Sequence, residues 1–219
     1  MIKKYLLDIF FWILAVFTLL FNNSKDGVFF LDVGQGDAVL IQKNDVQILI
    51  DGGEDNSVLC QIGKYMPIGD MKIELVVLTH PHSDHLNGLF YIFERYEIEE
   101  VWYNDIDYKS EIYEYFLELD IPREEAKEGI IYYIDTWRME VLSVHDEIYE
   151  EDSNVNNSSI ALQLNTGNNT FLFMGDAEME EEEYLIQESV LEDIDILKAG
   201  HHCSRTASSD NFLNIVKPQ

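Results

Sequence analysis

The sequence predicts a mixed α/β fold of the α+β kind, preceded by an N-terminal hydrophobic helix. From residue 25 onward, short β-branched apolar runs alternate with segments of helical spacing, and turn residues separate them. Residues 5–21 instead form one apolar run behind two lysines. The chain has 219 residues, of which 47% are hydrophobic and 26% charged, so it is large and apolar enough to fold around a core. We expect an N-terminal segment over residues 1–24 and a globular domain over residues 25–219.

The N-terminal segment is typical of a membrane anchor or a signal peptide. Lys3 and Lys4 precede an apolar run that only Asp8 and Thr18 interrupt, and no small-residue cleavage site follows it. The run over residues 5–21 approaches the ~20 residues that a membrane-spanning helix needs. We expect an uncleaved membrane anchor, with the lysines inside and an extracytoplasmic domain. The alternatives are a secreted domain and an amphipathic or core helix.

The first half of the domain is expected to consist of strands that end in polar turns. Strands are predicted over residues 28–33, 38–42, 46–50 and 73–79, and a short helix over residues 57–65. The turn after the first strand holds Gly34 and Gly36, and the third strand ends at Asp51-Gly52-Gly53. Glycines in such turns allow the backbone to approach neighbouring groups closely.

A histidine-rich loop after the fourth strand gives the clearest sign of chemistry. It reads His80-Pro-His82-Ser-Asp84-His85 and leads directly into a segment of helical spacing. Imidazole suits zinc, iron and manganese, and a carboxylate adds charge. His80 and His82 can close on one ion, while Asp84 and His85 can point to a second. The loop therefore predicts a metal site at the end of a buried strand.

The second half of the domain shows the same pattern of hairpins and polar strand ends. Strands are predicted over residues 101–103, 130–134, 139–144, 160–164, 170–174 and 195–198, and helices over residues 110–119 and 210–216. One hairpin ends at Asp176, which is suited to bridge two metals or, alternatively, to cap a helix. The last strand leads to His201 and His202. The acidic run over residues 178–183 is expected to form the solvated first turns of a helix.

The charge of the chain limits its partners. It has 14 Lys+Arg against 42 Asp+Glu, a formal net charge of −28. Non-specific nucleic-acid binding needs an excess of Lys and Arg, so we expect no such binding by this chain alone. Bound divalent cations can reverse the local field, which leaves a phosphate-bearing substrate open. The two cysteines, Cys60 and Cys203, form no recognisable disulfide framework.

Six motifs follow one another along the chain and read LDVGQGDAVLIQ, LIDGG, LTHPHSDHLNGL, NNSSIALQL, FLFMGDAE and LKAGHHCSRTASS. In this order they resemble the metallo-β-lactamase fold and, within it, the hydrolase domain of ComEC-type competence (DNA-uptake) proteins and their stand-alone relatives. The resemblance covers about Gly27 to the end. It implies a four-layer αββα sandwich. It also implies two divalent metal ions, Zn²⁺ or Mn²⁺, in the cleft between the two sheets.

The same resemblance implies a ligand set for the two metals. His80 and His82 would hold one metal, and Asp84, His85 and His202 the other. Asp176 would bridge the two ions. His201 would contact the substrate, although the roles within this late histidine pair could be reversed.

Further residues are expected to support the site or to take part in catalysis. Asp32, Asp51, Asn157 and Ser158 would support the ligands from behind rather than bind metal. Asp84 and His201 are the candidate catalytic residues, Asp84 as a ligand of the reacting centre. His201 would act as an extra hydrogen-bond donor or general acid.

Three features depart from the family pattern. The general superfamily has another histidine before the bridging aspartate, whereas residues 154–159 contain none, and nearby His145 is interpreted as incidental. One metal would then bind more weakly, or be completed by water or by Asn157. Cys203 replaces a glycine of the subgroup and is expected to pack rather than to bind metal. The subgroup continues beyond the last helix, so the domain is expected to be truncated at its C-terminus.

The ligand set and the resemblance together predict a binuclear metal-dependent hydrolase. The metals would lower the pKa of a water held between them to about 7, and the resulting bridging hydroxide would attack the substrate. A phosphodiesterase or nuclease of the competence-protein type is the first expectation, with single-stranded DNA among its substrates. The alternatives are hydrolysis of a small lactam, lactone or cell-wall phosphoester, and a non-catalytic metal-binding module of a DNA-uptake apparatus. The sequence indicates no particular protein partner.

Overall fold

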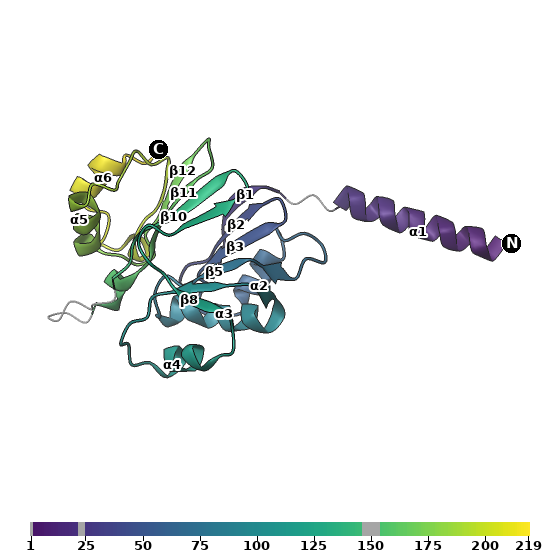
Figure 1. The fold of residues 1–219 in the computed structure, drawn as a ribbon, viewed down its shortest axis with the longest axis horizontal. Helices are drawn as coiled ribbons and strands as arrows, with labels where there is room; N and C mark the ends of the chain where they lie inside the picture. Colours follow the sequence, from purple (N-terminus) through teal and green to yellow (C-terminus); the bar gives the residue numbers. More distant parts are fainter. Residues whose placement is uncertain (1, 22–24, 146–153) are drawn as a thin grey trace.

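The computed structural model describes residues 2–21, 25–145 and 154–219 (Figure 1). Helix α1 (Ile2–Phe21) comes first and carries exposed apolar side chains, among them Phe11 and Trp12. In these ranges we find no helix that is long and apolar enough to cross a membrane. The anchor predicted over residues 1–24 lies partly outside the described residues, and membrane attachment stays a prediction.

The first sheet has six strands in the order β1-β2-β3-β5-β7-β8. They are β1 (Gly27–Phe30), β2 (Val39–Lys43), β3 (Val46–Ile50), β5 (Leu75–Val77), β7 (Val101–Tyr103) and β8 (Arg123–Glu125). The first three strands form an antiparallel meander, and the last four run parallel from β3 onward. Three helices accompany this sheet: α2 (Ser57–Ile62), α3 (Ser83–Arg95) and α4 (Glu111–Glu118). Two short strands, β4 (Lys72–Ile73) and β6 (Glu97–Ile98), pair separately.

The second sheet has five strands in the order β13-β12-β11-β10-β9. They are β9 (Ile131–Ile134), β10 (Trp137–Ser143), β11 (Ala161–Asn165), β12 (Thr170–Phe173) and β13 (Ile196–Lys198). All neighbouring pairs are antiparallel except β12 and β13, which are parallel. Two helices and two 3₁₀ turns accompany it: α5 (Met179–Gln187), α6 (Asp210–Val216), η1 (Val155–Ser158) and η2 (His201–Cys203).

Three apolar clusters divide the domain into four layers. On β2, Val39 and Ile41 point into the core between the two sheets, whereas Leu40 points into the core beneath α2, α3 and α4. Leu172 on β12 likewise points away from the inter-sheet core, into a third cluster with Phe212 of α6. This alternation of side chains follows from the period of two in a strand. Helix, sheet, sheet and helix layers result, and the predicted αββα sandwich is confirmed (Figure 1).

Most predicted elements occur within a few residues of their expected bounds, but three expectations need correction. The strand expected over residues 73–79 breaks at Glu74, whose carboxylate accepts a hydrogen bond from the Gln47 amide. Strand β8 is absent from the predicted elements, because its residues are polar. The solvated face expected over residues 178–183 is wrong for Glu178, Glu181 and Glu182, which are buried. All three accept hydrogen bonds there, Glu178 from two asparagines, Glu181 from Ser143 and Glu182 from the backbone at the start of α6.

Candidate metal centre

Strand ends from both sheets meet at one edge of the sandwich. Strands β1, β3 and β5 of the first sheet and β12 and β13 of the second run toward this edge. The loops that follow them carry the predicted ligands, in the histidine loop, at Asp176 and in the late histidine pair, together with the predicted supporting residue Asp51. The topology therefore gathers side chains that lie up to about 150 residues apart in sequence, as expected for polar residues at the ends of core strands.

The centre of the site is a cluster of two carboxylates and two imidazoles. One donor atom from each of Asp37, His85, Asp176 and His202 lies within 4.8 Å of the other three. Asp176 is central, with Oδ1 3.2 Å from His85 Nε2 and Oδ2 3.3 Å from His202 Nε2. His202 Nδ1 lies 3.4 Å from Asp37 Oδ1. Such a mixed set of nitrogen and oxygen donors suits a divalent transition metal.

The remaining predicted ligands flank this cluster. His80 Nε2 lies 3.8 Å from Asp176 Oδ2, and the His80 ring lies 4.2 Å from the His85 ring and 4.7 Å from the His82 ring, between centroids. Asp84 Oδ2 lies 3.4 Å from His202 Nε2. All six predicted metal ligands are thus brought together. Their assignment to one ion or the other stays a prediction.

The donor atoms at the centre have few partners within the protein. His80 Nε2, His85 Nε2, His202 Nε2 and Asp176 Oδ1 are buried and make no hydrogen bond among the described residues. Buried polar atoms normally have such partners, because leaving one unsatisfied costs about 1–3 kcal/mol. The four atoms face one another in a cluster that contains carboxylates and imidazoles. The residues present therefore fit a bound metal, which would satisfy these atoms at once.

A buried aspartate orients one of the imidazoles. Asp51 is fully buried at the end of β3, and its Oδ2 lies 2.8 Å from His85 Nδ1. Thr79 fixes the same carboxylate with two hydrogen bonds, from its backbone amide and its hydroxyl, both 2.8 Å long. With Nδ1 bound in this way, His85 turns Nε2 toward Asp176. This carboxylate–imidazole arrangement is the one that commonly supports metal-binding histidines.

The clustered carboxylates attract positive charge strongly. Burial alone would lower the pKa of His85, but the Asp51 and Asp176 carboxylates outweigh it and raise the pKa to about 10. The carboxylates that contact its ring nitrogens, that of Asp176 first, raise the pKa of His202 to about 11. Burial also works against the ionised form of Asp176, yet the neighbouring imidazoles of His202 and His85 hold its pKa well below the ordinary value.

Tight backbone packing fixes the loops around the site. Positive φ angles of 42°, 50° and 62° occur in succession at His201, His202 and Cys203, and residues other than glycine rarely adopt them. A Cβ atom on Gly200 would lie 2.1 Å from the carbonyl oxygen of Ala177, so only glycine fits there. Three left-handed residues in succession turn the chain sharply after β13. His202 consequently points into the cluster.

His201 points to a separate hydrogen-bond network beside the cluster. Its Nδ1 lies 2.7 Å from Oε1 of Glu178, at the start of α5. The Glu178 carboxylate also accepts hydrogen bonds of 2.9 Å from Asn154 and 3.0 Å from Asn156. Thr206 lies 3.3 Å from the same ring nitrogen. His201 is therefore held next to the cluster of carboxylates and imidazoles but does not belong to it.

The predicted supporting residues other than Asp51 differ in whether they contact the site. Asp32 is a correction, because it is exposed and, in the described parts of the chain, only its carbonyl forms a hydrogen bond, from Gln61. Asn157 accepts a hydrogen bond from the Glu178 amide. Ser158 bonds within its own turn, to the Val155 carbonyl, and therefore does not touch a ligand.

Two residues that touch the cluster are not among those predicted from the sequence. Asp37 belongs to a glycine-rich turn, yet it contacts His202 and forms an ion pair with Lys198 of β13. Ser159, next to the predicted Ser158, accepts a hydrogen bond from the Asp176 backbone amide at 3.0 Å. The sequence does carry a signal for Asp37, since this residue directly precedes a buried strand at the same sheet edge as the other ligands.

Two further residues lie outside the cluster. His145 Nε2 lies 3.0 Å from Glu181 Oε2, and its ring packs on Tyr184 of α5. Cys203 is exposed and forms no disulfide. Neither residue belongs to the group of donors around Asp176.

Comparison with known proteins identifies the family. The family model of the metallo-beta-lactamase superfamily matches residues 31–219. The chain belongs to this superfamily. It is 30% identical over 192 residues to recombination protein 2 of Haemophilus influenzae and 23% identical over 219 residues to ComE operon protein 3 of Bacillus subtilis. The resemblance predicted from the six motifs is confirmed.

The metallo-beta-lactamase domain corresponds to only a part of those relatives. The two alignments cover 86% and 90% of this chain but 23% and 28% of the relatives, so the chain spans about a quarter of their length. Solved structures agree on the fold. YhfI of Bacillus subtilis has a TM-score of 0.51 at 18% identity, covering 78% of this chain and 70% of YhfI. The subclass B3 metallo-beta-lactamase MEM-A1, from a soil metagenome library, has a TM-score of 0.54 at 15% identity, covering 80% and 76%.

Proposed function

We propose that this chain is a metal-dependent hydrolase that cleaves phosphodiesters. The observation that carries the proposal is the convergence of buried imidazole and carboxylate atoms that make no hydrogen bond with the described residues. Membership of the metallo-beta-lactamase superfamily supports metal-dependent hydrolysis. Similarity to recombination protein 2 and ComE operon protein 3 supports a phosphodiester as substrate, with single-stranded DNA as the first polymer to try.

The residues of the cluster would hold two divalent ions, Zn²⁺ or Mn²⁺. The ligands would be Asp37 and the six residues predicted from the sequence, namely His80, His82, Asp84, His85, Asp176 and His202. Bound ions would supply Lewis acidity, which lowers the pKa of a water molecule and stabilises negative charge on the substrate. Asp176 is buried among three imidazoles, so its carboxylate would be a ligand at the centre of the site.

The protein's own groups would order the hydrolytic step. In that step the oxygen of water bonds to phosphorus, the bond from phosphorus to the leaving oxygen breaks, and the leaving oxygen takes up a proton. Asp51 and Thr79 keep His85 in place behind the cluster, so the ligands need not reorganise during the reaction.

In this proposal His201 would donate the proton. Its Nδ1 contacts Glu178, which leaves Nε2 for the substrate. The His201 ring can donate a proton from Nε2 to the leaving oxygen, while the Glu178 carboxylate contacts Nδ1 and orients the ring. The neighbouring His202 lies in the metal cluster, with ring centroids 6.1 Å apart, so the donor lies close to the reacting centre.

The test uses the full chain loaded with Zn²⁺ and, separately, with Mn²⁺. Metal content is measured alongside hydrolysis of bis(p-nitrophenyl) phosphate, and the variant Asp84→Ala plus His85→Ala serves as the comparison. We expect about two metals per chain and turnover that the double substitution abolishes. Less than one metal with no turnover would overturn the proposal and favour a non-catalytic metal-binding module of an uptake apparatus.

The charge of the chain supports a second candidate substrate. A net charge of −28 repels anionic polymers, so a small neutral lactam or lactone is the alternative. A chromogenic cephalosporin distinguishes the two candidates when it is tested beside the phosphodiester. Faster turnover of the cephalosporin would favour the lactam.

We also propose that α1 attaches the domain to a membrane, with the domain outside the cytoplasm. The exposed apolar side chains of Phe10, Phe11 and Trp12 support this proposal, because such side chains favour a lipid interface. Flotation of the full chain with lipid vesicles tests it, and the variant Phe11→Glu plus Trp12→Glu should abolish flotation. Equal flotation of both proteins would count against attachment through α1.

A further inference from the structure

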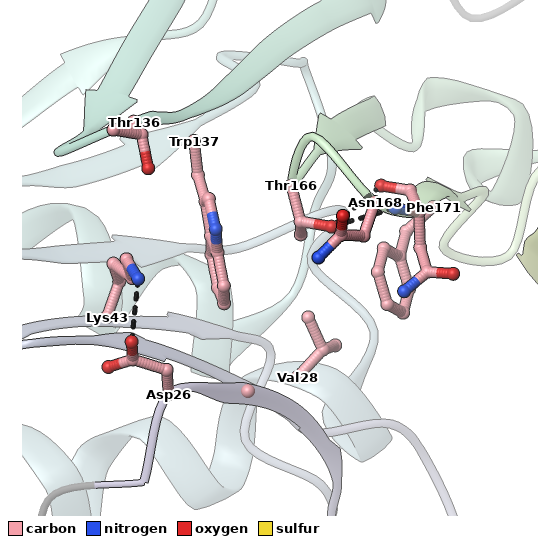
Figure 2. Close-up of a pocket in the computed structure, with 10 residues that line it drawn as sticks. Asp26, Val28, Lys43, Thr136, Trp137, Thr166, Asn168 and Phe171 are labelled. Carbon is pink, nitrogen blue, oxygen red and sulfur yellow. Dashed lines mark hydrogen bonds and ion pairs between the residues drawn. The ribbon is translucent and has the colours of Figure 1, made fainter.

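A second pocket lies at the opposite end of the sandwich from the metal cluster. Its volume is about 510 Å³, within the roughly 300–1,000 Å³ range of small-molecule sites. Four segments form it: the start of β1, the end of β2, the turn between β9 and β10, and the turn between β11 and β12 (Figure 2). Because β12 begins at this pocket and leads to Asp176, the two sites are separated by the length of the strands. The proposed hydrolysis uses none of the residues that line the pocket.

An aromatic wall divides the pocket. Figure 2 shows the Trp137 ring between the Lys43–Asp26 pair on one side and Thr166, Asn168 and Phe171 on the other. Trp137 is 9% exposed and Phe171 7% exposed, so both rings are anchored in the core and held rigidly. Rigid aromatic rings offer a flat apolar surface without a large cost in side-chain entropy.

The charges at the pocket cancel each other. Lys43 Nζ lies 2.6 Å from Asp26 Oδ2 and 5.2 Å from the centre of the Trp137 ring. A ligand anion would have to displace Asp26 from Lys43. A ligand cation would compete with Lys43 for both the carboxylate and the indole. The pocket therefore favours an uncharged ligand.

Uncharged hydrogen-bonding groups complete the lining. The side-chain amides of Asn168 and Asn169 and the hydroxyl of Thr136 line the pocket, and in the described parts of the chain we find no hydrogen bond for any of them. Thr166 by contrast is used within its turn, where its hydroxyl bonds the backbone of Asn169. Each free amide offers two donors and an acceptor, and the hydroxyl offers both functions.

We propose that this pocket binds a neutral carbohydrate of one or two sugar units. Sugar rings present C–H groups that pack on aromatic faces, and hydroxyl groups that pair with side-chain amides. The rigid Trp137 ring and the free amides of Asn168 and Asn169 supply both kinds of partner within one cavity of suitable size. The mutual neutralisation of Lys43 and Asp26 disfavours charged ligands.

The test is a titration of the full ¹⁵N-labelled chain with N-acetylglucosamine and its dimer. The chain has three tryptophans, so its spectrum has three indole N–H resonances, and Trp137→Phe identifies one of them. We expect that resonance alone to shift saturably. The variant Asn168→Ala plus Asn169→Ala should bind about tenfold more weakly or worse, which corresponds to roughly 1.4 kcal/mol.

The matched control is Asn211→Ala plus Asn214→Ala, which removes two exposed amides from α6 and should leave binding unchanged. Glucose 6-phosphate serves as a charged probe and should bind no better than glucose. If Trp137→Phe does not fold, comparing the Asn168→Ala plus Asn169→Ala variant with its control still tests the proposal, because Asn168 and Asn169 lie in an exposed turn. No saturable shift, equal affinity of the Asn168–Asn169 variant, or preference for the phosphate would each overturn the proposal.

Discussion

At the scale of single residues, Asp51 is expected to control metal affinity without binding metal. The substitution Asp51→Asn keeps the shape of the side chain and tolerates the φ of 58° found there, but it weakens the hold on His85 Nδ1. Loss of such a partner lowers metal affinity by roughly 10–100-fold. Competition with a chromogenic zinc chelator measures the change. Asp32→Asn is the matched control and should have no effect, whereas equal affinities for wild type and Asp51→Asn would contradict the assignment.

Glu178 is expected to position His201 for proton transfer. In Glu178→Gln an amide replaces the carboxylate that contacts His201 Nδ1 and orients the ring, while the contacts with Asn154 and Asn156 can largely be kept. We expect kcat for bis(p-nitrophenyl) phosphate to fall about tenfold or more, with KM and metal content little changed. Glu183→Gln removes an exposed carboxylate from the same helix and should behave as wild type. A change in metal content instead of kcat would assign Glu178 a purely structural role.

The residues of the site were predictable only where their sequence context was unusual. Three histidines and an aspartate within six residues are typical of a metal site, and the structure brings all of them to one edge. Asp37 and Asp32 lie in the same motif, and in the sequence only the position of Asp37 just before a buried strand distinguishes them. What separates them is the turn, which returns Asp37 to the sheet edge, where Gly53 donates to its carbonyl, and leaves Asp32 exposed. Such a distinction depends on backbone geometry that residue types alone do not contain.

At the scale of elements, the glycine turn after β1 is expected to support the histidine loop by close contact. A Cβ atom on Gly36 would lie 1.7 Å from the carbonyl oxygen of Asp84, and the φ of this glycine is +93°. Gly69 has a similar φ of +86° but nothing within 4 Å of such a Cβ atom. Gly69→Ala should therefore lower the free energy of unfolding by about 1–2 kcal/mol, the cost of a left-handed backbone at an alanine. Gly36→Ala should lower it by several kcal/mol more, since the histidine loop must also move.

Urea unfolding of both variants measures this difference, and metal content shows whether the histidine loop has shifted. Equal loss of stability in the two variants would mean that the contact between Gly36 and the loop is unimportant. The comparison is informative because both glycines share the same backbone strain. Only the neighbouring backbone differs.

Strands and helices with strong apolar patterns were predictable from the sequence, and polar ones were not. The strand over residues 46–50 and the helix over residues 210–216 have the expected bounds, since both bury an apolar face. β8 is held instead by its parallel pairing with β7 and by the Arg123 guanidinium, which donates to three carbonyls of the α4 region. Glu181 is buried because Ser143 and His145 meet it from the second sheet. These contacts join distant segments, so no local pattern reveals them.

At the scale of the whole molecule, the charge of −28 and the metal cluster act in opposite directions on an anionic substrate. The overall field repels a phosphodiester at long range, whereas bound cations attract it at short range. Added salt screens the long-range part first, because the screening length falls from about 30 Å at 0.01 M to about 10 Å at 0.1 M. The contacts inside the buried site are much less affected.

We therefore expect kcat/KM for bis(p-nitrophenyl) phosphate to rise with salt over this range, by about threefold or more, because repulsion of the substrate is relieved. A neutral chromogenic lactam or ester should show no such rise, and it serves as the control for effects of salt on the protein itself. The measurement is initial rate at low substrate concentration in the Mn²⁺-loaded and Zn²⁺-loaded chain. A fall in kcat/KM with salt for the phosphodiester alone would mean that the field at the site entrance is already positive. The objection that the acidity of this chain raises against a polynucleotide substrate would then no longer hold.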